Sequence, residues 1–233
     1  MEYTLSLALV DFLPVTFTAI GYYFLCRMIS HINPQQGKIA SIGATLIVAG
    51  GFFKAVWKTF MATTGGETNI VWMDEGLFVW MAPGYILLAW SVWQAVREVR
   101  RKKTFHAWFL PVILSVLTLG YAYYLYTTGG SWNLILLIVL VLGSTTTSIL
   151  LIAFAFRENL KSMGILFIIN LICVFILSGL ARIPEQTIML QWIEESINTV
   201  SWFCFLIAMK KMYEYTRINF GVDPAQNLQP ATA

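Results

Sequence analysis

The sequence predicts an all-α integral membrane protein, a single seven-transmembrane-helix bundle with its N-terminus outside and its C-terminus in the cytoplasm. Hydrophobic residues make up 58% of the chain and charged residues only 12%, and the mean hydropathy is +0.70. These values lie outside ordinary soluble usage. A helix rising 1.5 Å per residue needs about 20 apolar residues to cross ~30 Å of hydrocarbon. Apolar runs of that length and a one-sided distribution of basic residues complete the prediction.

Seven apolar runs satisfy this length requirement. They cover residues 5–29, 39–61, 70–96, 105–126, 133–155, 163–180 and 189–213. The connections between them are short, so residues 1–219 are expected to form one transmembrane domain. The tail 220–233 is rich in Pro, Ala, Gln and Asn, and we expect it to be a disordered cytoplasmic segment.

The first three runs each carry a local signal. An acidic residue, Glu2, and no basic segment precede the first run, which is therefore expected to be a retained helix rather than a cleaved signal. Small residues in the second run, such as Gly43 and Gly50, predict close helix packing. Pro83 and Gly84 fall in the middle of the third run and predict a kink there.

The later runs are marked by aromatic and polar residues. Four tyrosines between positions 121 and 126 end the fourth run and predict an interfacial aromatic belt. The fifth run has a Ser/Thr-rich middle at 144–148, and the sixth contains Asn170, which both indicate hydrogen bonds between helices. The seventh run carries Gln191, Glu194, Glu195 and Asn198 at helical spacing, so these side chains share one face.

Orientation follows from the basic residues of the connections. The chain has 15 Lys and Arg residues. All except Lys54, Lys58 and Arg182 flank the first, third and fifth connections or the C-terminal end of the last run. Basic connections face the cytoplasm. The turns at 63–68 and 127–131 both contain Thr-Thr-Gly-Gly and no basic residue, as external turns should.

A band of charged residues is predicted inside the outer half of the bundle. At 1.5 Å per residue, Asp11, Glu75, Glu194 and Glu195 lie roughly 7–10 Å below the ends of their helices. Lys54 and Lys58 enter the same band from the second helix. A charge facing lipid costs about 2.5–3.5 kcal/mol, so these side chains should turn inward and pair or line a cavity. The candidate ligand-binding residues are Lys54, Lys58, Glu75, Glu194, Glu195, Asn198, Asp11, Asp74, Arg182 and Gln191.

Three functions are compatible with this band. The first is binding or transport of a small charged or zwitterionic solute, with Lys54 as counter-charge and Glu75, Glu194 and Glu195 as coupling carboxylates. The second is a seven-helix sensor or membrane-complex subunit that binds a ligand or partner without transport. The third is a lipid-modifying membrane enzyme using paired carboxylates. Because the inner halves of four helices are almost wholly apolar, a continuous transport pathway is not evident.

The residues give little support for a metal site, a haem site or a retinal site. Two histidines, His31 and His106, are too few for a multi-histidine metal site or a bis-histidine haem. The seven-helix plan resembles microbial rhodopsins in outline, but the middle of the last helix has Ser201 and Trp202 where retinal proteins need a lysine. We therefore expect no cofactor, no metal, no catalytic residues and no nucleic-acid partner. The expected location is a plasma or inner membrane, with the lipid bilayer as surroundings and the basic loop 97–103 as a contact for protein or anionic lipid.

Overall fold

The computed structural model describes residues 4–67, 69–102, 107–180, 183 and 187–220, and in this part of the chain every regular element is an α-helix. The helices are α1 (Leu5–Val10), α2 (Phe12–Ile32), α3 (Pro34–Thr63), α4 (Val71–Val99), α5 (Phe109–Thr127), α6 (Trp132–Arg157), α7 (Lys161–Leu180) and α8 (Ile188–Phe220). Each predicted run therefore coincides with a helical segment, with ends shifted by a few residues. The tail 221–233, Lys103, His106 and Arg182 lie outside the described residues.

Six of the long helical segments are long and apolar enough to cross a membrane, if α1 and α2 are taken together. The first is the segment Leu5–Ile32, and the others are α3, α4, α5, α6 and α7. This confirms a multi-pass α-helical membrane protein, while α8 does not meet the same standard.

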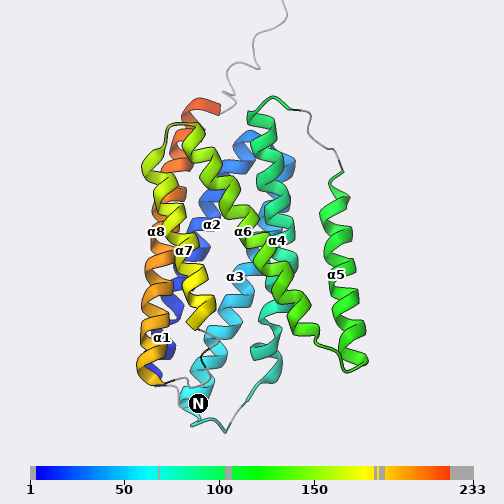
Figure 1. The fold of residues 1–233 in the computed structure, drawn as a ribbon, viewed down its shortest axis with the longest axis vertical. Helices are drawn as coiled ribbons and strands as arrows, with labels where there is room; N and C mark the ends of the chain where they lie inside the picture. Colours follow the sequence, from blue (N-terminus) through cyan, green and yellow to red (C-terminus); the bar gives the residue numbers. More distant parts are fainter. Residues whose placement is uncertain (1–3, 68, 103–106, 181–182, 184–186, 221–233) are drawn as a thin grey trace, which may run out of the picture.

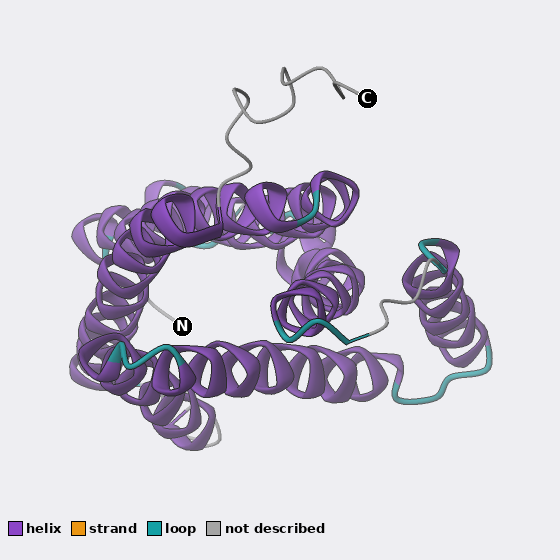
Figure 2. Cartoon of the chain, turned by 90° about the horizontal axis from the view of Figure 1, so that it is seen from above, coloured by secondary structure: helices purple, strands orange, loops and turns teal. Residues whose placement is uncertain are grey.

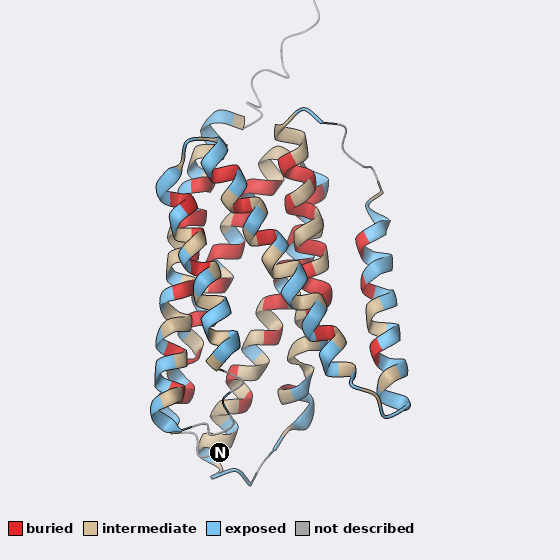
Figure 3. Cartoon of the chain, in the orientation of Figure 1, coloured by how far each residue is buried: buried red, intermediate tan, exposed pale blue. Residues whose placement is uncertain are grey.

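The helices form a closed ring with one helix outside it. Neighbours around the ring are α2, α3, α4, α6, α7 and α8, and α8 returns to α2. Figure 2 shows this arrangement along the bundle, and Figure 1 shows α5 standing apart, beside α4 and α6. Only Pro111, Ser115 and Ala122 of α5 are buried, so most of this helix is coloured as exposed or intermediate in Figure 3.

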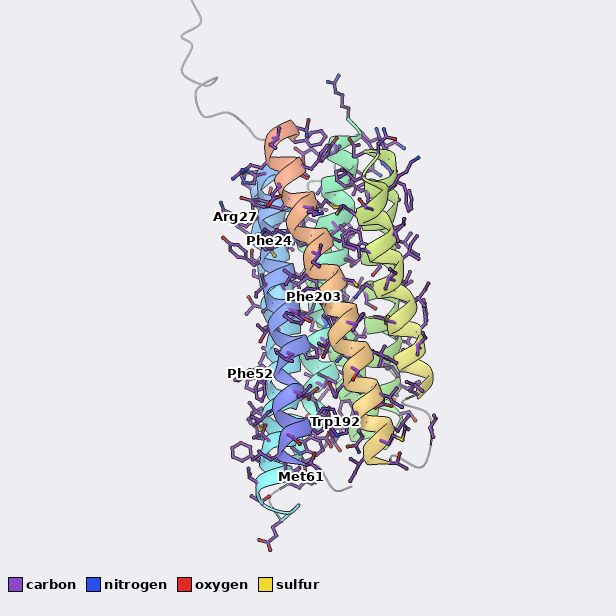
Figure 4. All side chains as sticks on the ribbon, turned by 90° about the vertical axis from the view of Figure 1, so that its left-hand side faces the viewer. Phe24, Arg27, Phe52, Met61, Trp192 and Phe203 are labelled. Atoms are coloured by element: carbon purple, nitrogen blue, oxygen red, sulfur yellow. The ribbon has the colours of Figure 1, made fainter. Side chains whose placement is uncertain are left out.

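Charged residues divide between the two ends of the bundle. Arg27 lies near one end and Met61 near the other (Figure 4). We call the end with the α2–α3, α4–α5 and α6–α7 connections the basic end, and the end with the α3–α4 and α5–α6 connections the acidic end. All described Lys and Arg residues except Lys54 and Lys58 lie toward the basic end. The predicted one-sided distribution therefore reappears in three dimensions.

The first predicted helix is interrupted at Asp11, which separates α1 from α2. Pro14 has no backbone N–H and so cannot donate to the carbonyl of Val10, which weakens the helix at this point. The N–H of Asp11 instead closes α1 by donating to Leu7 and Leu9 carbonyls. The interruption places the Asp11 carboxylate at the junction of two helices, and its residue is only 8% exposed.

Both Thr-Thr-Gly-Gly segments end a helix in the same way. Thr64 and Thr128 donate their hydroxyls to the carbonyls of Phe60 and Tyr124, each at a distance of 2.8–2.9 Å. The following glycines, Gly65 and Gly129, have φ values of 61° and 74°, a region that favours residues without a Cβ. This αL-type helix termination explains the repeated motif as local turn chemistry.

Helices α3 and α4 approach each other closely at Gly43 and Gly84. A Cβ atom on Gly43 would lie 2.6 Å from the carbonyl oxygen of Gly84, and one on Gly84 would lie 2.8 Å from that of Gly43. The small residues predicted to allow close packing thus do so. Pro83 does not break α4, which runs without interruption from Val71 to Val99. Close contact between the two helices also brings Asp74 of α4 beside Lys54 of α3.

The hydrophobic core occupies the half of the bundle toward the basic end. Its largest cluster combines residues such as Leu25, Ile47, Leu88, Phe167 and Met209, which come from five helices of the ring. Within it the hydroxyl of Tyr22 donates to that of Tyr85 at 3.0 Å. Burial of this apolar surface stabilises the bundle by packing, because lipid is as apolar as the side chains. The buried ion pairs of Lys58 lie in the other, acidic half.

Candidate functional site

Lys58 on α3 lies between two carboxylates from other helices. Its Nζ is 2.8 Å from Oε1 of Glu195 on α8 and 3.0 Å from Oδ2 of Asp11. The side chains of these residues are between 8% and 18% exposed. A charged group so far from water needs opposite charges and hydrogen bonds around it. The triad therefore joins the α1–α2 junction, α3 and α8 through one ammonium group.

Lys54, one helical turn away on α3, belongs to a second ion pair. Its Nζ contacts Oδ1 of Asp74 on α4 and lies 4.2 Å from the ring centre of Trp57. Trp57 in turn donates its Nε1–H to Oδ1 of Asn69 at 3.0 Å. The side chains of Lys54 and Asp74 are 26% and 35% exposed, so this pair is wetter than the Lys58 triad. Lys54 is held by a carboxylate and an aromatic ring at once.

The two lysines of α3 have different partners. Lys54 does not pair with Glu195, since Lys58 occupies that position and Lys54 contacts Asp74. The side chain of Lys58 is the less exposed of the two lysines. Two carboxylates, those of Asp11 and Glu195, meet its ammonium group there. Depth along a helix was readable from the sequence, but the facing partner was not.

Helix α8 presents a row of oxygen atoms to the interior that have no hydrogen-bond partner among the described residues. They are Oε1 of Gln191, Oε1 of Glu194, Oε2 of Glu195 and Oγ1 of Thr199. Their positions repeat at three- and four-residue intervals, so they lie on one face. Gln191 and Glu195 are 7% and 6% exposed. Thr199 was missed at the sequence level, although its position four residues after Glu195 would have indicated it.

Of two further candidate ligand-binding residues, Asn198 lies beside this face of α8 and Glu75 lies apart from it. Asn198 is half-buried on α8 between Glu194 and Thr199, so it belongs to the same region. Glu75 is exposed and lines a different cavity, between α4, α5 and α6. The structure therefore separates Glu75 from the ion pairs of its neighbour Asp74. Arg182 is outside the described residues, so its predicted place in the band has no structural counterpart here.

Among the described residues, acidic groups outnumber basic ones in the interior of the acidic half. Two ammonium groups, on Lys54 and Lys58, stand against four carboxyl groups, on Asp11, Asp74, Glu194 and Glu195. Both lysines are engaged, whereas oxygen acceptors remain on α8. Such a region favours a ligand that carries hydrogen-bond donors and positive charge. Among the described residues there is no group of three or more His, Cys, Asp or Glu side chains arranged to hold a metal ion.

Comparison of the chain with protein-family models, with curated proteins and with solved structures finds no match. The function proposed below therefore depends on the geometry of the chain itself.

Proposed function

We propose that the chain crosses the membrane seven times with its acidic end outside, and that the interior of its acidic half binds a small solute carrying a protonated amine. The row of buried oxygen acceptors on α8 is the observation that carries this proposal. A protonated amine has several N–H donors and a positive charge, and so complements these oxygens. A zwitterionic solute that presents its amine to α8 belongs to the same class.

The seventh span is α8. It has 33 residues, or about 50 Å of helix, which is longer than a membrane. Between Glu195 and Lys210 the segment 196–209 has no charged residue. Glu195 is paired with Lys58, and Lys210 and Lys211 can extend toward the headgroups. The positive-inside rule then places the basic end in the cytoplasm.

The engaged state of Lys54 and Lys58 supports a cationic rather than an anionic ligand. The sequence suggested Lys54 as a counter-charge for an anion, but its ammonium group already contacts Asp74. An anion would have to displace this carboxylate and would also face Glu194 and Glu195. Like charges in a medium of low polarity repel strongly, which disfavours that occupant.

Thermal stability of the purified protein in detergent tests the proposal. We expect a panel of amines to raise the melting temperature of the wild type, whereas inorganic anions of equal concentration do not. The variant Gln191→Leu, which removes one acceptor without breaking an ion pair, should show a smaller shift. Ser196→Ala, on the exposed side of α8, is the matched control and should retain the full shift. Stabilisation by anions alone would contradict the proposal.

Binding without transport, as in a sensor or a subunit of a membrane complex, is the second candidate. The packed core of the basic half, including the Tyr22–Tyr85 hydrogen bond, favours it because this core lies between the acidic interior and the opposite end. Uptake of a radiolabelled amine into vesicles separates the two candidates. Amine stabilisation without uptake would favour the sensor or subunit, while uptake that depends on Gln191 would favour transport.

The basic loop is proposed as a contact for anionic lipid or for a cytoplasmic protein. Arg101 and Lys102 are exposed there, whereas Arg97 lies over the ring of Trp93 at 4.9 Å and is held close to α4. Clustered basic residues next to a membrane helix attract anionic headgroups by about 1 kcal/mol each. Loss of affinity for anionic vesicles after replacing Arg101 and Lys102 with Gln would support the lipid contact.

A further inference from the structure

A cavity of about 970 Å³ lies at the acidic end on the outside of the ring, between α4, α5 and α6. It exists because α5 stands apart from the ring (Figure 1). Five aromatic rings and one carboxyl group line it: Trp72, Trp80, Tyr123, Tyr126, Trp132 and Glu75. The ligand-binding region of α8 contributes no residue to this lining.

The aromatic walls are held by other rings. On the α4 side, Trp72 and Trp80 both pack against Phe53 of α3, with ring centres 5.5 and 5.7 Å from it. On the opposite side, Tyr126 of α5 meets Trp132 of α6 edge to face at 6.0 Å. Such contacts fix the orientation of the rings. Ring contacts therefore fix the aromatic walls of the cavity on its α4 side and on the side formed by α5 and α6.

Glu75 is the charged residue of this cavity. It is exposed, and among the described residues its carboxylate forms no ion pair or hydrogen bond. Rings of Trp and Tyr attract a cation through their negative faces, and the carboxylate adds a full opposite charge. Aromatic rings around a carboxylate suit a quaternary ammonium group, which has no N–H and needs no hydrogen-bond acceptor.

We call the five aromatic rings that line this cavity the aromatic cage. Hydrogen-bond donors line the same cavity. Asn69 lines the same cavity, and its Oδ1 accepts from Trp57, which directs its Nδ2 group away from that bond. The phenol groups of Tyr123 and Tyr126 are exposed at the same end of α5. Amide and phenol groups can donate to a phosphate oxygen. A phosphate next to a quaternary ammonium group is the headgroup arrangement of phosphatidylcholine.

A second, apolar cavity of about 510 Å³ lies beyond the first, toward the basic end, between the same three helices. The two cavities adjoin on α5, where Leu119 lines the first and Thr118 the second. Ile86, at the start of the second cavity, is roughly 16 Å along α4 from Glu75. This distance is about the depth of one leaflet, half of ~30 Å. A lipid whose ammonium group lies at Glu75 therefore extends an acyl chain to the second cavity.

We propose that the groove between α4, α5 and α6 binds one phosphatidylcholine molecule, with its trimethylammonium group in the aromatic cage beside Glu75 and one acyl chain along α5. The carboxylate of Glu75 and the aromatic cage bind the headgroup selectively. The second, apolar cavity accommodates the acyl chain. The bound lipid fills the space between α5 and the ring. This site is independent of the amine site on α8.

Native mass spectrometry of the full chain in detergent tests the site. The protein is incubated with phosphatidylcholine and phosphatidylglycerol of identical chains, and the retained lipid is identified. We expect one phosphatidylcholine per chain, preferred by about three- to thirtyfold. Glu75→Gln and Tyr123→Leu should reduce this preference toward one. The matched controls are Glu67→Gln, an exposed acid in the α3–α4 turn, and Tyr124→Leu, an exposed neighbour outside the cavity, and both should retain it.

Two competition experiments identify whether the bound ammonium group belongs to a long-chain lipid. Dihexanoyl phosphatidylcholine and free choline should compete poorly with the long-chain lipid, because neither fills the second cavity. Competition by choline as effective as that by the long-chain lipid would overturn the lipid assignment. Equal retention of both headgroups by the wild type, an unchanged preference in Glu75→Gln, or a wild type that retains no lipid would each overturn the proposal as well.

Discussion

Lys58 and Glu195 form an ion pair of 2.8 Å between α3 and α8, two helices that are not neighbours in the ring. Asp11 completes the contact at 3.0 Å from the same ammonium group. Packing of neighbouring helices cannot tie α3 to α8, so this polar contact holds the acidic half together across its interior. The basic half has a hydrophobic core for the same purpose.

Removal of Lys58 should destabilise the protein strongly, because it leaves two carboxylates buried without a cation. For Lys58→Met we expect a loss of about 3–5 kcal/mol in the free energy of unfolding. The double variant Lys58→Met/Glu195→Gln should lose less than the sum of the two single variants, as expected for contacting residues. Reversible unfolding in detergent measures all three losses.

Lys54 provides the comparison for this double-mutant cycle of Lys58 and Glu195. Lys54→Met should cost only about 0–1 kcal/mol, since the pair with Asp74 is partly exposed and screened. Its effect should add to that of Glu195→Gln, because the two residues do not contact each other. If Lys54, rather than Lys58, were coupled to Glu195, the ion-pair arrangement described above would be incorrect.

The close approach of α3 and α4 should make Gly43 intolerant of a side chain. In Gly43→Ala the new Cβ would meet the carbonyl oxygen of Gly84 at 2.6 Å, and a backbone atom cannot move aside easily. We expect a loss of about 1–3 kcal/mol in thermal or denaturant unfolding. Gly51→Ala is the control on the same helix. Its Cβ would lie 3.6 Å from Val15, an ordinary contact, so it should be neutral or gain up to about 1 kcal/mol in helix propensity.

A hydrogen-bonded pair ties α7 to α8 in the middle of the bundle. Asn170 donates from Nδ2 to Oγ of Ser201 at 2.9 Å and to its carbonyl at 3.1 Å, and both residues are buried. Asn170→Leu should therefore destabilise by about 0.6–2 kcal/mol, as for interhelical hydrogen bonds in membranes. Ser178→Ala, exposed on the same helix and bonded only to the Val174 carbonyl, should change the unfolding midpoint little. Equal losses in both variants would show that the bond contributes nothing specific.

Orientation can be measured with single cysteines. On a background in which Cys26, Cys173 and Cys204 are replaced by Ala, Glu67→Cys should react with a membrane-impermeant maleimide added to intact cells. Lys102→Cys should react only after the cells are permeabilised. These outcomes follow from basic residues facing the cytoplasm. Labelling in the reverse order would place the amine site of α8 on the cytoplasmic side.

Much of the helix arrangement was predictable because hydropathy and the helical rise act locally. Segment length predicted seven helical segments, and position along each segment predicted that Lys58, Asp11 and Glu195 lie at similar depth. The small residues of α3 likewise indicated a close contact. Pro14 is likewise the signal in the sequence for the break at Asp11, three residues earlier.

The sequence by itself determined which residues are helical, which end of the bundle is basic and how deep each charge lies, because these properties depend on neighbouring residues along the chain. Only the tertiary structure decided which side chains meet. Asp74 and Glu75 are adjacent, but successive helical residues point about 100° apart, so Asp74 contacts Lys54 while Glu75 lines the cavity beside α5. Rotation of each helix about its axis is set by packing against other helices, and that information is spread over the whole chain.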